Sequence, residues 1–192
     1  MKGTAVTLST MLVPTYVQML TALSNWLGKA DAQLPDGAAD TLLVASLAPD
    51  MFPLSTQIRF ACVQAREGVC RLRGQEFPPS IDVLLNEGRD AAVHPGSIAD
   101  AQTRIDETLA SLGEAAAFPD IDPSTPIAHA LPTGMIFDLT AEQYVRDWAL
   151  PQFYFHVMIA YAVLRREGVE LGKPDYVAHM FAYLRPGTMP TG

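Results

Sequence analysis

The sequence predicts an all-α protein, an antiparallel four-helix bundle with one small β-hairpin before the last long helix. Apolar residues recur three or four positions apart along four long stretches, which is the spacing of one helix face. Only one pair of short apolar runs flanks a glycine-containing turn, which is the pattern of a hairpin. The chain of 192 residues is 49% hydrophobic and 18% charged, so it can bury a core within a single domain.

The first helix is expected from Leu8 to Leu27, where Pro14 lies early enough to bend the helix without ending it. No charged residue occurs between Lys2 and Lys29, so the outer face of this helix is polar but uncharged. Such a face either arises by chance or packs against a second subunit. From the second alternative we predict a homodimer that forms through the first helix.

The second helix is expected over residues 54–72, because its apolar stripe begins after Pro53 and Gly74 supplies a stop. Residues 75–97 have little periodicity and contain two adjacent prolines, so we expect a surface excursion with at most a short helix. The third long helix is expected over residues 97–112.

The hairpin is expected to pair residues 127–131 with residues 135–139. Thr140 and Gln143 then have the spacing of a capping box, which predicts the start of the last long helix. Pro151 falls inside that helix and removes one backbone hydrogen bond, so we expect a kink or a restart near it.

Charge and cysteine content exclude several classes of function. Thirteen basic and 21 acidic residues give a net charge of -8 without a Lys/Arg stripe, so nucleic acid is not an expected partner. Cys62 and Cys70 are eight residues apart on one helix, about 12 Å along its axis, which is too far for a disulfide. Reduced thiols favour a cytoplasmic protein. The uncharged N-terminal segment is interrupted by polar residues, so neither a secretion signal nor a membrane span is expected.

His156 is the only group that titrates near neutral pH within the apolar segment 148–164. A buried imidazole either forms a structural hydrogen bond or belongs to a site, where it could act as a general base, a ligand contact or a metal ligand. Gln152 precedes it by one helical turn. Tyr161 follows it and could present a hydroxyl to a pocket, although it could equally belong to the core.

Two residues near the start of the second helix are candidate companions of His156. Asp50 could face His156 at the end of the bundle, or it could cap the second helix. Gln57 could reach a ligand or Gln152, or it could tie two helices together. The predicted ligand-binding residues are therefore Asp50, Gln57, Gln152, His156 and Tyr161, and His156 is the best candidate for a catalytic group.

Several segments carry a resemblance to a known family. They read Ala-Pro-Asp-Met-Phe-Pro-Leu at 48–54, Thr-Arg-Ile-Asp-Glu-Thr-Leu-Ala-Ser-Leu at 103–112, Ala-Leu-Pro-Gln-Phe-Tyr-Phe-His at 149–156 and Ala-Tyr-Ala-Val-Leu-Arg-Arg-Glu-Gly-Val-Glu-Leu-Gly-Lys at 160–173. They resemble domain-of-unknown-function family nineteen-ninety-three, in the DinB-like (DinB/YfiT) superfamily of metalloenzymes. The resemblance implies a four-helix bundle that is commonly dimeric.

The resemblance also implies what a metal site in this superfamily requires. Members with assigned roles hold a divalent metal with three histidines, one on the second helix and two on the fourth. Here the second helix has no histidine and the fourth has only His156, with Ala160 and Tyr161 following it. We therefore expect no complete metal site and no cofactor, although a divalent metal at His156 stays an alternative.

The sequence leaves three functional hypotheses open. The first is a DinB-like bundle, residues 1–176 with a C-terminal extension at 177–192, that binds a small apolar or thiol-bearing molecule between the second and fourth helices. The second is a metal-assisted, thiol-dependent transferase that uses His156. The third is a structural or interaction dimer without catalysis.

Overall fold

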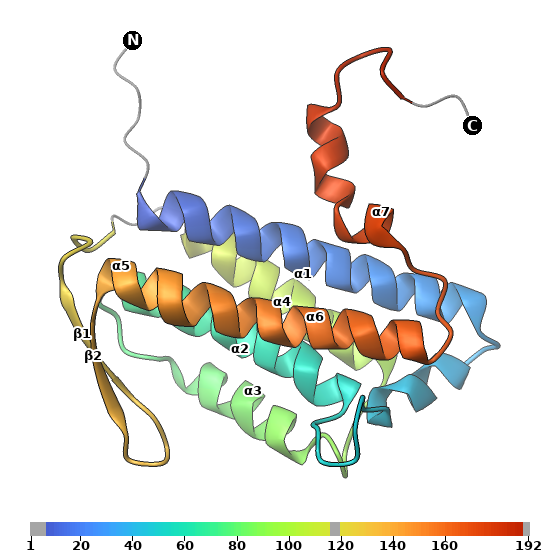
Figure 1. Cartoon of the computed structure of the whole chain (residues 1–192). Coiled ribbons are helices and arrows are strands. Elements are labelled where there is room, and N and C mark those ends of the chain that lie inside the picture. The colour runs from blue at the N-terminus through green and yellow to red at the C-terminus, as the bar shows by residue number, and fades with distance from the viewer. Residues whose placement is uncertain (1–6, 116–119, 190–192) are drawn as a thin grey trace.

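The computed structural model describes residues 7–115 and 120–189, which are mostly helical and include one two-stranded antiparallel sheet (Figure 1). The prediction of a helical protein with one small hairpin is confirmed at this level. None of the described helices is long and apolar enough to cross a membrane.

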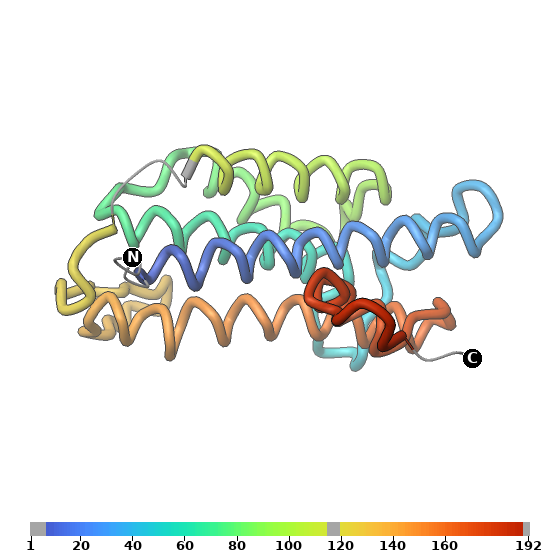
Figure 2. Tube along the Cα trace, turned by 90° about the horizontal axis from the view of Figure 1, so that it is seen from above, coloured from blue at the N-terminus to red at the C-terminus, as the bar shows by residue number. Residues whose placement is uncertain are grey.

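Four long helices lie side by side: α1 (Leu8–Gln33), α2 (Leu54–Leu72), α4 (Ile98–Ala115) and α6 (Leu150–Arg166). Helices α1 and α6 run in one direction, and α2 and α4 run in the other (Figures 1 and 2). The neighbours α2 and α4 are therefore parallel, which departs from the predicted antiparallel order. An additional helix between them returns the chain to the end at which α2 began.

That additional helix is α3 (Pro79–Asp90), which lies where the sequence predicted a surface excursion with at most a short helix. Ile81 and Leu84 are almost completely buried, so α3 packs against α2 as an addition to the four long helices. Gly88 makes the close approach possible, because a Cβ at this position would lie 2.6 Å from the Phe60 ring on α2. The periodicity was hard to detect because the buried stripe of α3 is only a few residues long.

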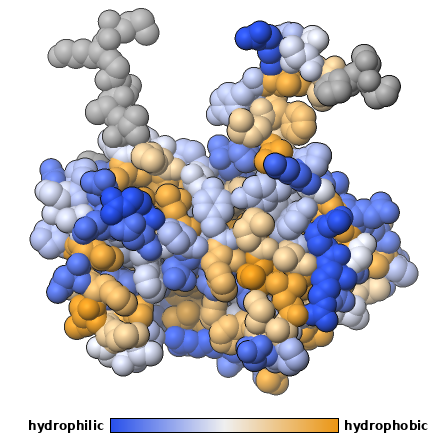
Figure 3. Space-filling model, in the orientation of Figure 1, coloured by the Kyte–Doolittle hydropathy of each residue, from blue (hydrophilic) through white to orange (hydrophobic). Residues whose placement is uncertain are grey.

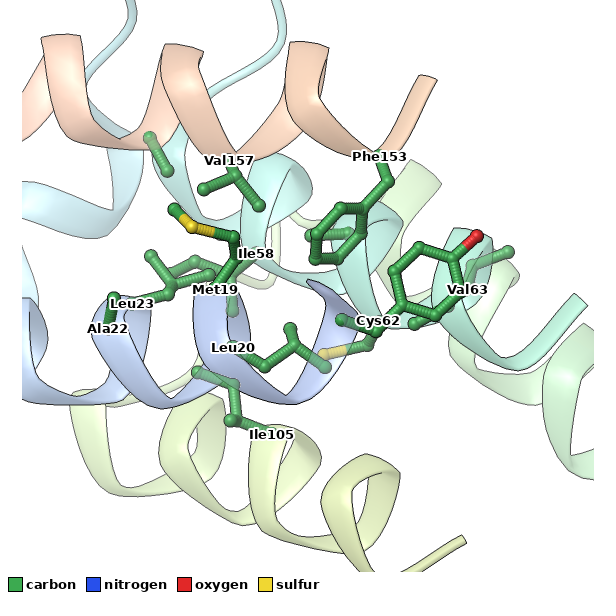
Figure 4. Close-up of a cluster of buried hydrophobic side chains, with 14 of the residues drawn as sticks. Met19, Leu20, Ala22, Leu23, Ile58, Cys62, Val63, Ile105, Phe153 and Val157 are labelled. Carbon is green, nitrogen blue, oxygen red and sulfur yellow. The ribbon is translucent and has the colours of Figure 1, made fainter. Parts of the chain in front are cut away.

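The core fills the space among the four long helices (Figure 4). Leu20 and Leu23 of α1, Ile58 of α2, Ile105 of α4 and Val157 of α6 are all inaccessible to solvent. Burial of this apolar surface is the main stabilising term for the fold.

The hairpin consists of β1 (Pro126–Ala130) and β2 (Ile136–Thr140), with His129 opposite Phe137. Side chains alternate along β1, so Ile127 and His129 point inward and their neighbours point to solvent. The hairpin closes one end of the helical layer (Figure 1).

The last long helix starts with the predicted capping box. The Thr140 backbone N–H donates to Gln143 Oε1 at 2.9 Å, and the Gln143 backbone N–H donates to Thr140 Oγ1 at 3.2 Å. After α5 (Ala141–Gln143), a π-helical segment, η2 (Tyr144–Ala149), precedes α6. The helix widens in this segment just before Pro151, which lacks a backbone N–H, so the predicted interruption takes the form of a π turn.

Three short elements complete the described chain: η1 (Ala38–Val44), α7 (Lys173–Tyr176) and η3 (Ala178–Tyr183). The chain from Lys173 to Tyr183 thus forms two short helical pieces. Figure 1 shows this segment leaving the body of the molecule beside α1. The division into residues 1–176 and an extension at 177–192 stays a prediction.

Candidate functional site

Gln57 and His156 form a hydrogen-bonded pair that links α2 to α6. The His156 Nδ1 atom lies 2.8 Å from Gln57 Oε1. The Gln57 side-chain N–H donates to the Phe52 backbone carbonyl at 3.1 Å, which turns the amide oxygen toward the imidazole. Gln57 therefore ties two helices together and fixes the histidine ring.

The surroundings of His156 keep its imidazole neutral. Burial lowers the pKa of His156 from 6.5 to about 4, because a charged ring there would lose its hydration. Since Gln57 Oε1 accepts a hydrogen bond, the proton of the neutral ring resides on Nδ1. The ring also contacts the aromatic side chains of Phe60 and Phe155, with centroids 5.4 Å away in each case.

The other predicted site residues do not gather around this pair. Asp50 is exposed in a turn, and α2 has Pro53 at its N-cap position, so Asp50 does not cap the helix. Gln152 is half-buried one turn before His156, without a hydrogen bond to any described residue. The Tyr161 ring packs against Trp26 and Tyr176, toward α1 and α7, with centroids 5.2 and 6.3 Å away.

A cavity of about 310 Å³ lies one side chain away from His156. Phe60 separates the two, because its ring contacts His156 on one side and lines the cavity on the other. Helices α2 and α3, the hairpin and the π-helical segment form the walls. The apolar lining comes from Phe52, Phe60, Val63, Phe77, Leu85, Ala130, Leu131, Pro132 and Trp148.

Several residues that line this cavity each hold a buried polar atom without a hydrogen-bond partner among the described residues. The atoms are Gln64 Oε1, Arg71 Nε, both ring nitrogens of His129 and Trp148 Nε1. An unpaired buried polar group costs about 1–3 kcal/mol, and a ligand or an ordered water beside the cavity would supply the missing partners. This cavity is therefore the candidate site.

His129 is held in the cavity wall by the alternation of β1 and by two aromatic rings. Its side chain is 5% exposed, and its ring centroid lies 4.3 Å from that of Trp148 and 5.4 Å from that of Tyr144. Burial, assisted by the positive charge of Arg71, lowers the pKa of His129. The neutral ring offers one donor and one acceptor to the cavity.

Glu67 is the acidic residue of the cavity. Burial raises its pKa from 4.5 to about 7; the charge of Arg71 opposes the rise and that of Asp82 adds to it. A carboxyl with this pKa exchanges a proton near neutral pH, which is uncommon outside functional sites.

Comparisons with known proteins identify the family. A family described as domain of unknown function (DUF1993) matches residues 8–177. The chain belongs to this family. A solved structure described as a DinB family member protein from Shewanella denitrificans is 30% identical to the DUF1993 chain, covers 95% of it and 96% of its own length, and superposes with a TM-score of 0.70. No curated protein matches the chain.

The histidine triad that the resemblance to the DinB-like superfamily implies does not fit the residues around His156. One imidazole nitrogen is engaged by Gln57, and the next turn of α6 supplies Ala160. Across the described residues of this DUF1993 chain, no three His, Cys, Asp or Glu side chains are grouped as a metal site requires. We therefore derive no chemical step through a metal.

Sequence reasoning missed the cavity because its lining comes from four elements. Gln64, Glu67 and Arg71 recur at helical spacing on α2, which was a detectable signal of one polar stripe. In the run Ile127-Ala-His129-Ala-Leu131, alternation indicated that the histidine points inward. No sequence pattern indicated that this stripe and this strand meet.

Proposed function

We propose that this DUF1993 protein is a DinB-like four-helix bundle that binds a small molecule with an apolar body and a polar end in the cavity beside Phe60. The observation that supports the proposal is that residues with unpartnered buried polar atoms line the same cavity as a group of aromatic side chains. Concave, mostly apolar sites with a few polar groups are typical of small-molecule binding. Nothing in the lining selects a thiol, so the proposal does not extend to thiol-bearing ligands.

Isothermal titration calorimetry with 4-ethylphenol tests this proposal, because the compound has one ring and one hydroxyl. We expect saturable binding to the full chain. Leu85→Trp places a larger side chain in the cavity. It should weaken binding of 4-ethylphenol at least about 10-fold, which corresponds to a loss of about 1.4 kcal/mol of binding free energy. Val83→Trp is the matched control, since Val83 lies on the same helix, is 57% exposed and is outside the cavity lining.

Absence of binding to the wild type, or equal binding by Leu85→Trp and the wild type, contradicts the proposal. Circular dichroism melting curves establish that both variants fold. Dialysis against EDTA should leave the dissociation constant unchanged, because the proposed binding groups are side chains rather than a metal.

We also propose a homodimer through the face formed by α1 and α6. The exposed side of α1 carries no charge from Thr7 to Gly28, in a chain with a net charge of -8. Phe155 and Met158 of the neighbouring α6 are 53% and 40% exposed. Figure 3 shows apolar residues over the part of this face that α6 crosses. Depletion of charge with exposed aromatic and methionine side chains is typical of interface cores.

A cytoplasmic location stays part of the proposal. Both cysteines, Cys62 and Cys70, are free. Burial raises the pKa of the Cys62 thiol to about 12, so this cysteine is an unreactive part of the core.

A further inference from the structure

The charged residues that line the cavity are two arginines and one glutamate. Arg71 is half-buried in the wall, its Nε atom has no hydrogen-bond partner, and no carboxylate of the described chain forms an ion pair with it. Its guanidinium carbon lies 4.5 Å from the centroid of the Phe77 ring. Arg89 is exposed and bonds only to Asn86 Oδ1, at 3.4 Å. The lining therefore has an excess of positive charge.

Other arginines of the chain have acidic partners. Arg104 bonds to Glu87 at 2.7 Å and to Glu107 at 2.9 Å, and Arg146 bonds to Asp147 at 2.8 Å. An arginine without an acidic partner in an apolar wall is expensive to desolvate unless a ligand supplies the negative charge. Arg71 thus differs from Arg104 and Arg146, and it differs from Arg66 and Arg89, which also lack an ion-paired carboxylate, in having no hydrogen bond to a described side chain.

Further donors lie on the same cavity. The Trp148 indole N–H is buried and unpartnered, and the neutral His129 ring has one N–H to donate. A guanidinium fork fits the two oxygens of a carboxylate. The walls are mostly aromatic and aliphatic, which suits a monoanion with an apolar body better than a heavily hydrated phosphate.

Glu67 does not prevent an anion from entering. Burial raises its pKa to about 7, so it binds a proton readily near neutral pH. The protonated carboxyl is a hydrogen-bond donor and carries no repelling charge.

We propose that the ligand of this cavity is a small monocarboxylic acid with an aromatic or branched apolar body. Arg71 and the Trp148 indole N–H bind the carboxylate, and Phe52, Phe60 and Phe77 contact the apolar body. The inference rests on the proposed small-molecule function and specifies its ligand class.

Matched pairs of acids and amides test the inference by calorimetry at pH 6.5. The probes are 3-phenylpropionate and 4-phenylbutyrate, each compared with its primary amide, which has the same shape without the charge. We expect at least one acid to bind about 10-fold more tightly than its amide, because a hydrogen bond from Arg71 to a charged carboxylate is stronger than one to a neutral amide. Arg71→Met should reduce this preference to less than about 2-fold while amide binding is kept.

Arg66→Met is the matched control, because Arg66 lies on the same helix and bonds to Ser80 Oγ at 2.8 Å, away from the cavity. It should keep the full preference for the acid. If Arg71→Met fails to fold, Trp148→Phe provides the second variant, which removes one donor and should weaken acid binding about 3- to 10-fold.

The possible results distinguish a failure of the carboxylate inference from a failure of the proposed small-molecule binding. Equal affinity for acids and amides overturns the carboxylate inference and leaves the small-molecule function standing. A preference that survives in both Arg71→Met and Trp148→Phe also overturns it. If acids, amides and 4-ethylphenol all fail to bind, the proposed function itself is wrong.

Discussion

Replacing Glu67 by Gln should change how the stability of the protein depends on pH. Glu67 lies in the cavity wall on α2, and none of the described residues forms an ion pair with it. The charged and titratable groups that act on it or respond to it are Arg71 and Cys70 on its own helix, Asp82 on α3, Tyr16 on α1 and Tyr144 on η2. Burial dominates, and it raises the pKa of Glu67 from 4.5 to about 7.

The direction in which Glu67 changes the stability with pH follows from proton linkage. Because the folded chain holds this proton more tightly than the unfolded chain, Glu67 has no effect on stability below pH 4.5, where both states are protonated. Between pH 4.5 and 7 the free energy of unfolding falls as pH rises, and above pH 7 the full loss remains. At about 1.4 kcal/mol for each factor of ten, the difference between the two pKa values amounts to about 3 kcal/mol.

Urea unfolding followed by circular dichroism at several values between pH 4 and 8.5 measures this effect. The free energy of unfolding of Glu67→Gln minus that of the wild type should rise by about 3 kcal/mol over this range. Subtraction removes the contributions of distant groups that titrate in both proteins. Asp106→Asn, an exposed carboxylate on α4, should give a nearly constant difference. A flat profile for Glu67→Gln refutes the reasoning.

Three further predictions concern the packing around the cavity, His156 and the dimer. Gly88→Ala should cost about 1–3 kcal/mol, because its Cβ would lie 2.6 Å from Phe60. At Gly113 on α4 an added Cβ would meet no described atom within 4 Å outside its own helix backbone, so Gly113→Ala should stabilise the fold by about 0.5–1 kcal/mol. Equal effects of the two substitutions in urea unfolding would contradict the close packing at Gly88. The His156 contribution is fully present above pH 6.5, and about 3 kcal/mol of it should be lost as pH falls to 4. His156→Phe should lack this loss, and a parallel pH profile would count against a buried neutral ring. Phe155→Lys with Met158→Lys should weaken dimerisation at least about 10-fold in sedimentation equilibrium, and unchanged association would rule out the α1–α6 face.

The sequence predicts the long helices well because each buries a long stripe of its own. The stripe of α2 locates both ends of that helix, and Gly74, with φ of 60°, adopts the left-handed conformation expected of a stop. The capping box of Thr140 and Gln143 is likewise a local pattern whose atoms lie three residues apart. Information of this kind is complete within one segment.

The cavity is formed by residues from several segments, so patterns within one segment do not predict it. His129 and Gln64 line one cavity although they lie on the hairpin and on α2, and the raised pKa of Glu67 comes from burial that its own segment does not reveal. His156 attracted attention because its own segment is apolar, but its partner Gln57 is 99 residues away. The hydrogen bond was one of two open alternatives until the two helices were placed.

The indole resonances of the two tryptophans give the most direct test of the cavity as the binding site. Trp148 lines the cavity and its Nε1 atom is buried without a partner, whereas Trp26 Nε1 donates to the Asp175 carbonyl at 3.3 Å, on the side of α7. In proton–nitrogen correlation spectra recorded during a titration with 4-phenylbutyrate, with Trp148→Phe for assignment, we predict a saturable shift of the Trp148 signal and a constant Trp26 signal. A shift of Trp26 alone, or no shift of Trp148 at saturating ligand, would contradict the account.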